Sequence, residues 1–103
     1  MRRYSLSPEK ASKISAYIGF ALKSRAVVMG VDYIRAAKGI ELIIADESLS
    51  PNSLKRLRRA AEAAGTECVT MPVAEVFPIS SVKALGIRNG ELAKAIINTI
   101  ESK

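Results

Sequence analysis

The chain has 103 residues, with 16 Lys and Arg, 10 Asp and Glu, no histidine and a formal net charge of +6. Its apolar fraction of 49% and charged fraction of 25% are typical of a globular domain and exclude a disordered chain. No apolar run approaches the ~18 residues that a membrane span needs, and the single cysteine cannot form an internal disulfide. We therefore expect one cytoplasmic domain over residues 1–103 that does not enter a membrane.

Three helix starts are readable from capping signals. Ser7-Pro8-Glu9 supplies a capping hydroxyl, a proline at the first helical position and an acid in the first turn, and predicts a helix over 8–23. Ser50-Pro51 repeats this signal and opens a helix that Gly65 ends. Asn89 is expected to cap a last helix, whose apolar face is Leu92, Ile96 and Ile100.

Short apolar segments between these helices predict strands. The four candidates are Ala26–Met29, Ile40–Ala45, Glu67–Met71 and Val82–Ile87. Val31–Lys38 reads as a short helix closed by Gly39, and Val73–Phe77 has room for one helical turn. Alternating helices and strands predict an α/β fold, a three-layer α/β/α sandwich with a four-stranded mixed sheet.

Little in the sequence supports catalysis. A chain with no histidine and one cysteine offers no recognisable metal-ligand spacing, and Cys68 in mid-strand is expected to be a small core residue. Asp46-Glu47 end a strand, where α/β enzymes often keep catalytic groups, but here they more simply begin a loop toward Ser50. The turn at Gly30 lacks dinucleotide and Walker patterns. We expect no enzyme activity, metal, cofactor or small-molecule substrate.

The positive charge and the segment Val27–Lys38 point to an anionic partner. A short apolar run breaks at Gly30 and restarts as a helix, and such a junction presents backbone N–H groups and a positive helix end. In a chain of pI ≈ 9.8, nucleic-acid phosphate is the expected ligand. A solvated basic surface and a plain tight turn are the alternatives.

Several stretches carry a resemblance to a known family. They are Gly19–Arg25 leading into Val27–Gly30, then Ile34–Gly39, Leu42–Ser48, and Val82–Ile87 with Arg88-Asn89-Gly90. Over nearly its whole length the chain resembles the small kink-turn RNA-binding ribosomal proteins of the L-seven-Ae/L-thirty-e superfamily, especially the bacterial YlxQ-like members. The resemblance implies the same α/β/α fold and non-catalytic binding of structured RNA, ribosomal or ribosome-associated, with ribosomal proteins as further partners.

The resemblance also implies where RNA would bind. In the family a glycine at the strand–helix turn begins a Gly-x-Asn-x-x-x-Lys signature, often with Glu after the Asn, and a second loop before the last strand covers a flipped-out base with apolar residues. Gly30 matches the glycine and Ile79–Ser81 lies near the second loop, but Asp32, Tyr33 and Ala36 replace the Asn, Glu and Lys. An ionised Asp32 accepts hydrogen bonds but cannot donate to guanine O6 or N7.

The RNA-contact residues that we expect are Lys23, Arg25, Gly30, Asp32, Tyr33, Arg35 and Lys38. Each has a plainer interpretation: Asp32 complements the helix dipole, Tyr33 is half-buried packing, and Arg35 and Lys38 are solvated. The Lys55–Arg59 cluster is either a solvated helix face or a phosphate contact. An alternative function is a relative of the same fold that has lost kink-turn recognition and works as a protein-interaction or ribosome-assembly module.

Overall fold

A computed structural model describes residues 2–79 and 81–102. The helices in this part of the chain are α1 (Pro8–Lys23), α2 (Val31–Ala36), α3 (Pro51–Ala64), α4 (Gly90–Glu101) and a 3-10 turn, η1 (Val73–Glu75). The strands are β1 (Arg2–Arg3), β2 (Val27–Met29), β3 (Leu42–Asp46), β4 (Glu67–Met71) and β5 (Ala84–Ile87). None of these helices is both long and apolar enough to cross a membrane.

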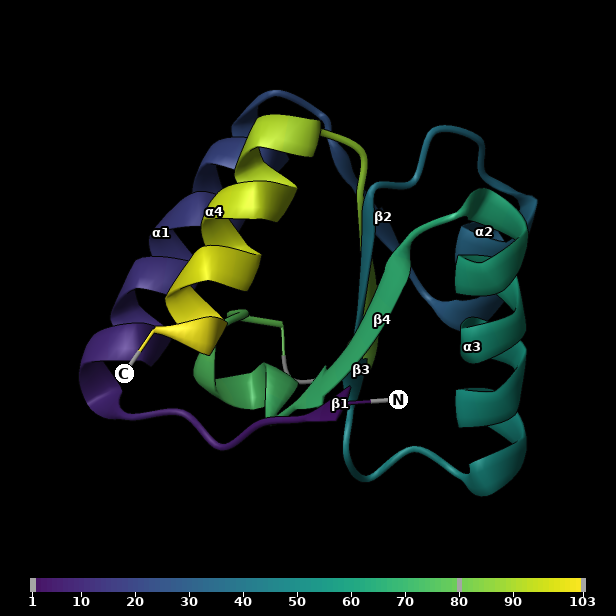
Figure 1. Cartoon of the computed structure of the whole chain (residues 1–103), viewed down its shortest axis with the longest axis horizontal. Helices are drawn as coiled ribbons and strands as arrows, with labels where there is room; N and C mark the ends of the chain where they lie inside the picture. Colours follow the sequence, from purple (N-terminus) through teal and green to yellow (C-terminus); the bar gives the residue numbers. More distant parts are fainter. Residues whose placement is uncertain (1, 80, 103) are drawn as a thin grey trace.

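The strands form one mixed sheet in the order β1-β4-β3-β5-β2. β4 runs parallel to β1 and β3, whereas β5 runs antiparallel to β3 and β2. Helices α1 and α4 cover one face of the sheet, and α2 and α3 cover the other (Figure 1). The predicted α/β/α sandwich and its four mixed strands are confirmed, and the two-residue β1 adds an edge that is too short to predict from sequence.

The central strand β3 is buried on both faces. Leu42 and Ile44 pack in the core under α1 and α4, while Ile43 and Ala45 pack in the core under α2 and α3. All four side chains have no exposed surface. This burial on both sides explains why the sequence of the strand is a continuous apolar run instead of an alternating one.

The three predicted helix starts are confirmed by their hydrogen bonds. The Ser7 hydroxyl accepts from the Lys10 N–H at 3.2 Å, and the Ser50 hydroxyl accepts from the Ser53 N–H at 3.2 Å. The Asn89 side chain accepts from the Leu92 N–H at 2.9 Å. Each cap satisfies one of the donors that a helix leaves unpaired in its first turn.

The prediction of a helix over 31–38 is wrong at its end. α2 stops at Ala36, and Ala37 is extended, with φ −77° and ψ 152°. Gly39 has a left-handed φ of 76° but lies beyond the helix and does not cap it. The helix ends early because Ile40, only 5% exposed, must return to the core beside Ile34.

Gly86 sets how closely α2 approaches the sheet. A Cβ at this position of β5 would lie 2.9 Å from Ile40 Cδ1 and 3.3 Å from Ile34 Cγ1. The absence of a side chain there lets Ile34 and Ile40 pack directly onto the strand backbone. This contact fixes the position of α2 and therefore of the residues that it exposes.

Asp46 is a buried carboxylate that joins three segments. It is 6% exposed and accepts hydrogen bonds from the Val73 N–H at 2.9 Å, the Ser48 N–H at 3.0 Å and the Ser48 hydroxyl. Burial opposes its ionisation, but the hydrogen bonds from Ser48 and Val73 and the charge of Lys83 hold the pKa of Asp46 below 3.8. Asp46 therefore ties the end of β3 to the following turn and to η1, a structural role.

We expect Asp46→Ala to lower the free energy of unfolding by about 1–3 kcal/mol at neutral pH, because three donors lose their acceptor. A carboxylate whose folded pKa is depressed stabilises the fold above its unfolded pKa, and this contribution is lost as pH falls through the folded pKa. The difference from wild type should therefore shrink below pH 3.8. Urea unfolding across this range measures it, with Glu75→Gln as an exposed carboxylate control. A difference independent of pH would contradict the assignment.

Candidate nucleic-acid interface

Gly30 joins β2 to α2 and is held in the sheet. Its backbone has φ 96° and ψ 147°, a conformation that residues with a Cβ rarely adopt. Its N–H donates to the Ala84 carbonyl at 3.0 Å, and its carbonyl accepts from the Ile34 N–H at 3.0 Å. The N–H of Gly30 itself is thus already paired, and a ligand at this turn would have to meet other groups.

The hydrogen bond from Gly30 to Ala84 places the start of β5 beside this turn. The Asp46 N–H donates to the Lys83 carbonyl at 2.8 Å, and the Val82 N–H donates to the Ile79 carbonyl at 3.1 Å. The expected second loop, Ile79–Ser81, is therefore at the same end of the sheet as Gly30. Ile79 and Ser81 are exposed, and Ser80 lies outside the described residues.

Three large apolar side chains are exposed on the turn and on the segment before β5. Met29 is 39% exposed, Tyr33 is 74% exposed and Ile79 is 46% exposed. Among the described residues, Phe20 on α1 is the other exposed large hydrophobic side chain. We call Met29, Gly30, Tyr33 and Ile79 the Gly30 corner. The exposure of Tyr33 excludes the interpretation that it is half-buried packing.

The polar positions after Gly30 face solvent. Asp32 lies in the first turn of α2 and is exposed, which suits both its interpretation as a dipole complement and a role as an acceptor toward a ligand. Ala36 is exposed as well, so the position where the family carries its Lys is a surface position without a cation.

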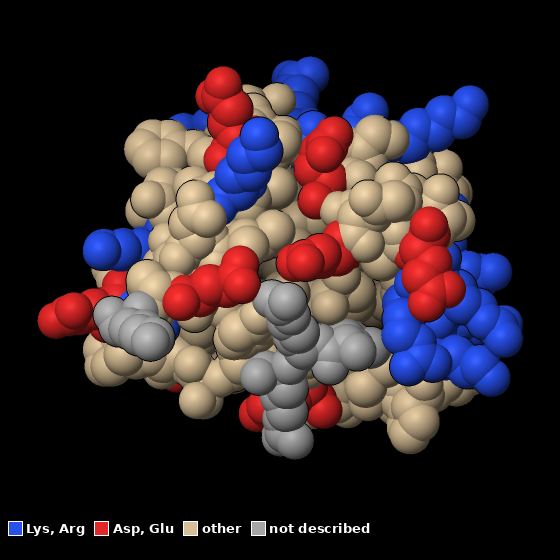
Figure 2. Space-filling view, in the orientation of Figure 1, with Lys and Arg blue, Asp and Glu red and all other residues tan. Residues whose placement is uncertain are grey.

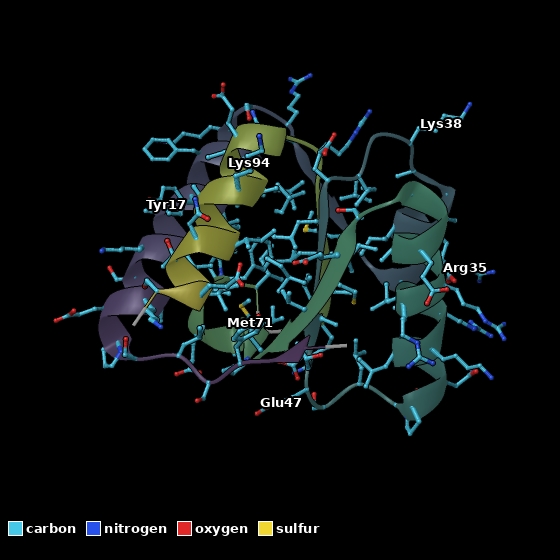
Figure 3. The ribbon with its side chains drawn as sticks, viewed as in Figure 1. Tyr17, Arg35, Lys38, Glu47, Met71 and Lys94 are labelled. Atoms are coloured by element: carbon cyan, nitrogen blue, oxygen red, sulfur yellow. The ribbon has the colours of Figure 1, made fainter. Side chains whose placement is uncertain are left out.

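Lys23 and Arg25 lie away from Gly30. They belong to the α1–β2 connection, and the Arg88 N–H donates to the Ala26 carbonyl at 2.8 Å beside them. Four residues lie between Arg25 and Gly30, three of them in β2, and five steps of nearly extended chain span about 16 Å. Lys38, past the end of α2, also lies toward that end of the sheet (Figure 3). The expected cations therefore do not converge around the glycine.

Arg25 has a strained backbone. Its φ of 59° is left-handed, and the Arg25 and Ala26 N–H groups donate to the carbonyls of Leu22 and Ala21, which makes the two bonds of a Schellman motif at the end of α1. The same two bonds close α3, where the left-handed position is Gly65. A residue with a Cβ at this position costs about 1–2 kcal/mol.

Arg35 belongs to a different cationic group from the one expected. It lines a groove between α2 and α3, whose lining residues are Arg35, Asn52, Lys55, Arg56, Arg59 and Ala60. Figure 2 shows the blue side chains massed over the side of the molecule formed by α2 and α3, and Figure 3 shows Arg35 directed outward there. We call this hollow the α2/α3 groove.

The sequence alone indicated part of this cationic group, the residues on α3. Asn52, Lys55, Arg56 and Arg59 recur at the three- and four-residue spacing of one helix face, opposite the buried Leu57. The contribution of Arg35 was not readable, because only the packing of α2 against α3 brings the two helices together.

Cys68 is half-buried, and burial raises the pKa of its thiol from 9.0 to about 11, so the thiol stays protonated at neutral pH. The described residues include no group of three or more Cys, Asp or Glu placed to hold a metal ion.

Comparisons with known proteins define the fold and go no further. No protein-family model matches the chain, and no curated protein matches it. The chain is similar to the solved structure of a protein of unknown function from Bacillus halodurans, with a TM-score of 0.74 over 87% of this chain and 98% of that one. The two are 14% identical, which shows a shared fold alone.

We expect Arg25→Gly to unfold with a free energy about 1 kcal/mol higher than Arg25→Ala, because glycine adopts the left-handed conformation without a Cβ clash. The alanine variant is the matched reference, since both variants lose the same charge at the end of α1. Urea unfolding of the two proteins measures the difference. Equal stability would show that Arg25 carries no backbone strain.

Proposed function

We propose that this chain is a non-catalytic binding protein for structured RNA that contains a sharp, kink-turn-like bend, and that the Gly30 corner meets the bend. One observation carries the proposal. The Gly30 N–H pairs with the carbonyl of Ala84, the first residue of β5, so the strand–helix turn and the segment that precedes β5 lie at one end of the sheet, where Met29, Tyr33 and Ile79 are exposed. Exposed aromatic and apolar side chains at one place are what unstacked bases require.

The side chains suggest how the bend would be recognised. Tyr33, projecting from the first turn of α2, offers a ring face on which an extruded base can stack. Met29 and Ile79 would cover the base from either side of the turn. Asp32 can accept a hydrogen bond from a guanine or cytosine amino group, and Ala36 removes a phosphate contact. Recognition would therefore depend on RNA shape more than on base sequence.

The cations extend the contact beyond the bend. Arg35 points outward from α2, Lys38 follows the end of that helix, and Lys23 and Arg25 lie at the far end of β2 from Gly30. Four such side chains would meet phosphates along an RNA that runs past the corner, and the strained Arg25 fits a position retained for contact. The family resemblance makes ribosomal or ribosome-associated RNA the proposed partner.

Filter binding with a kinked RNA stem and a plain duplex of equal length tests the proposal. We expect wild type to prefer the kinked stem, and Tyr33→Ala to weaken that preference by about tenfold through lost base stacking. Phe20→Ala is the matched control, because Phe20 is 60% exposed on α1, away from the corner. Equal affinity of wild type for both RNAs would remove the kink-specific function.

The second candidate is a protein-interaction or ribosome-assembly module that no longer reads kinked RNA. Asp32, Tyr33 and Ala36 favour it, because all three replace groups with which the family contacts RNA. The double variant Arg35→Glu/Lys38→Glu separates the two. We expect it to lose RNA retention while the tagged chain keeps its protein partners in a pull-down, and the reverse result would favour the second candidate.

A further inference from the structure

The α2/α3 groove brings together cations from two helices. Its lining includes four cations and no acid. The side chains of Arg35, Lys55, Arg56 and Arg59 form no hydrogen bond or ion pair with another described residue. The nearest acid along α3 is Glu62, which lies one turn further on and outside the lining. Unpaired like charges held together are costly without a counter-ion, so the groove is suited to a polyanion.

The side chains in the groove favour phosphate over a protein segment. Three of the four cations are arginines, whose planar guanidinium groups bind phosphate through two parallel hydrogen bonds, and Asn52 adds an amide donor. Ala60 is the sole apolar residue of the lining. Protein interfaces are anchored by large buried aromatic or aliphatic side chains, for which this groove has no pocket.

The spacing along α3 suits an extended ligand. Lys55 and Arg59 are four residues apart, as are Asn52 and Arg56, which places the members of each pair about 6 Å apart along the helix axis. Arg35 faces them from α2. The groove thus has polar side chains on both of its sides, and along α3 they repeat at about one helical turn.

The groove begins at the same end of the sheet as the Gly30 corner. Asn52 is in the first turn of α3, just after the end of β3, and the Asp46 N–H at that end donates to the Lys83 carbonyl beside Ala84. Ala60 lies toward the other end of α3.

We propose that the α2/α3 groove binds the phosphate backbone of the helical stem that leads away from the RNA bend. This inference rests on the proposed function, and the stem contact is independent of base sequence.

The test measures the salt dependence of RNA binding. The variant Arg56→Gln/Arg59→Gln should reduce the slope of log affinity against log salt by about two, because each lost phosphate contact removes close to one released counter-ion. The loss should be the same for a kinked stem and for a plain duplex, so that their affinity ratio stays at the wild-type value. A kinked RNA with its stem cut to about four base pairs should show the reduced slope with wild-type protein, because α3 spans about six to seven base pairs.

The control variant is Lys13→Gln/Lys94→Gln, which removes the same charge from exposed positions on α1 and α4, on the opposite layer (Figure 3). We expect it to keep the wild-type slope. Arg56→Lys/Arg59→Lys should restore most of the slope, since a lysine still releases a counter-ion, and this variant also guards against misfolding of the glutamine protein.

The outcomes separate the two proposals. If wild type prefers kinked RNA and Arg56→Gln/Arg59→Gln keeps the wild-type slope, the proposal that the groove binds the stem is wrong and the proposed function stands. A reduced slope without any preference for the kink would support the groove and remove kink recognition. An equal loss of slope in the control variant would show general attraction by net charge and overturn the groove. If Arg56→Gln/Arg59→Gln loses a protein partner while its RNA slope is unchanged, the groove binds protein, and the proposal of an RNA stem contact is wrong.

Discussion

The burial of β3 on both of its faces is the constraint on which the rest of the structure depends. The strand buries Leu42 and Ile44 on one face and Ile43 and Ala45 on the other, so helices must cover both faces. Helices α1 and α4 cover the first face, and α2 and α3 cover the second. β3 also pairs parallel with β4 and antiparallel with β5. Because this pairing is antiparallel, β5 begins beside the end of β3. The Gly30 turn lies at the same end of the sheet, where its N–H pairs with Ala84. The candidate interface is therefore a consequence of the core.

At that end of the sheet the backbone is held by hydrogen bonds, while several large side chains are exposed to solvent. The Gly30 N–H is paired with Ala84, and the Asp46 carboxylate closes the turn after β3 onto η1. These bonds hold a rigid frame from which Met29, Tyr33 and Ile79 project into solvent. Under the proposed function, apolar side chains on a backbone held by these bonds would lower the entropic cost of binding an unstacked base.

The structure divides the positive charge into two groups. Lys23 and Arg25 lie at the α1–β2 connection with Arg88, and Lys38 lies toward the same end of the sheet, whereas Arg35 joins Lys55, Arg56 and Arg59 in the α2/α3 groove. Apolar contacts and charge contacts thus occupy adjoining surfaces. Under the proposed function, the Gly30 corner would distinguish the shape of an RNA and the α2/α3 groove would only add affinity.

The sequence by itself determined the elements whose signals are local. Ser7, Ser50 and Asn89 cap helices through bonds to residues three positions away, and the double-faced burial of β3 shows in its unbroken apolar run. Only the tertiary structure decided that α2 ends at Ala36, that Arg25 lies far from Gly30, and that Arg35 faces α3. These outcomes depend on contacts between segments distant in the chain, such as Ile40 with Gly86, and a local pattern contains no record of such contacts.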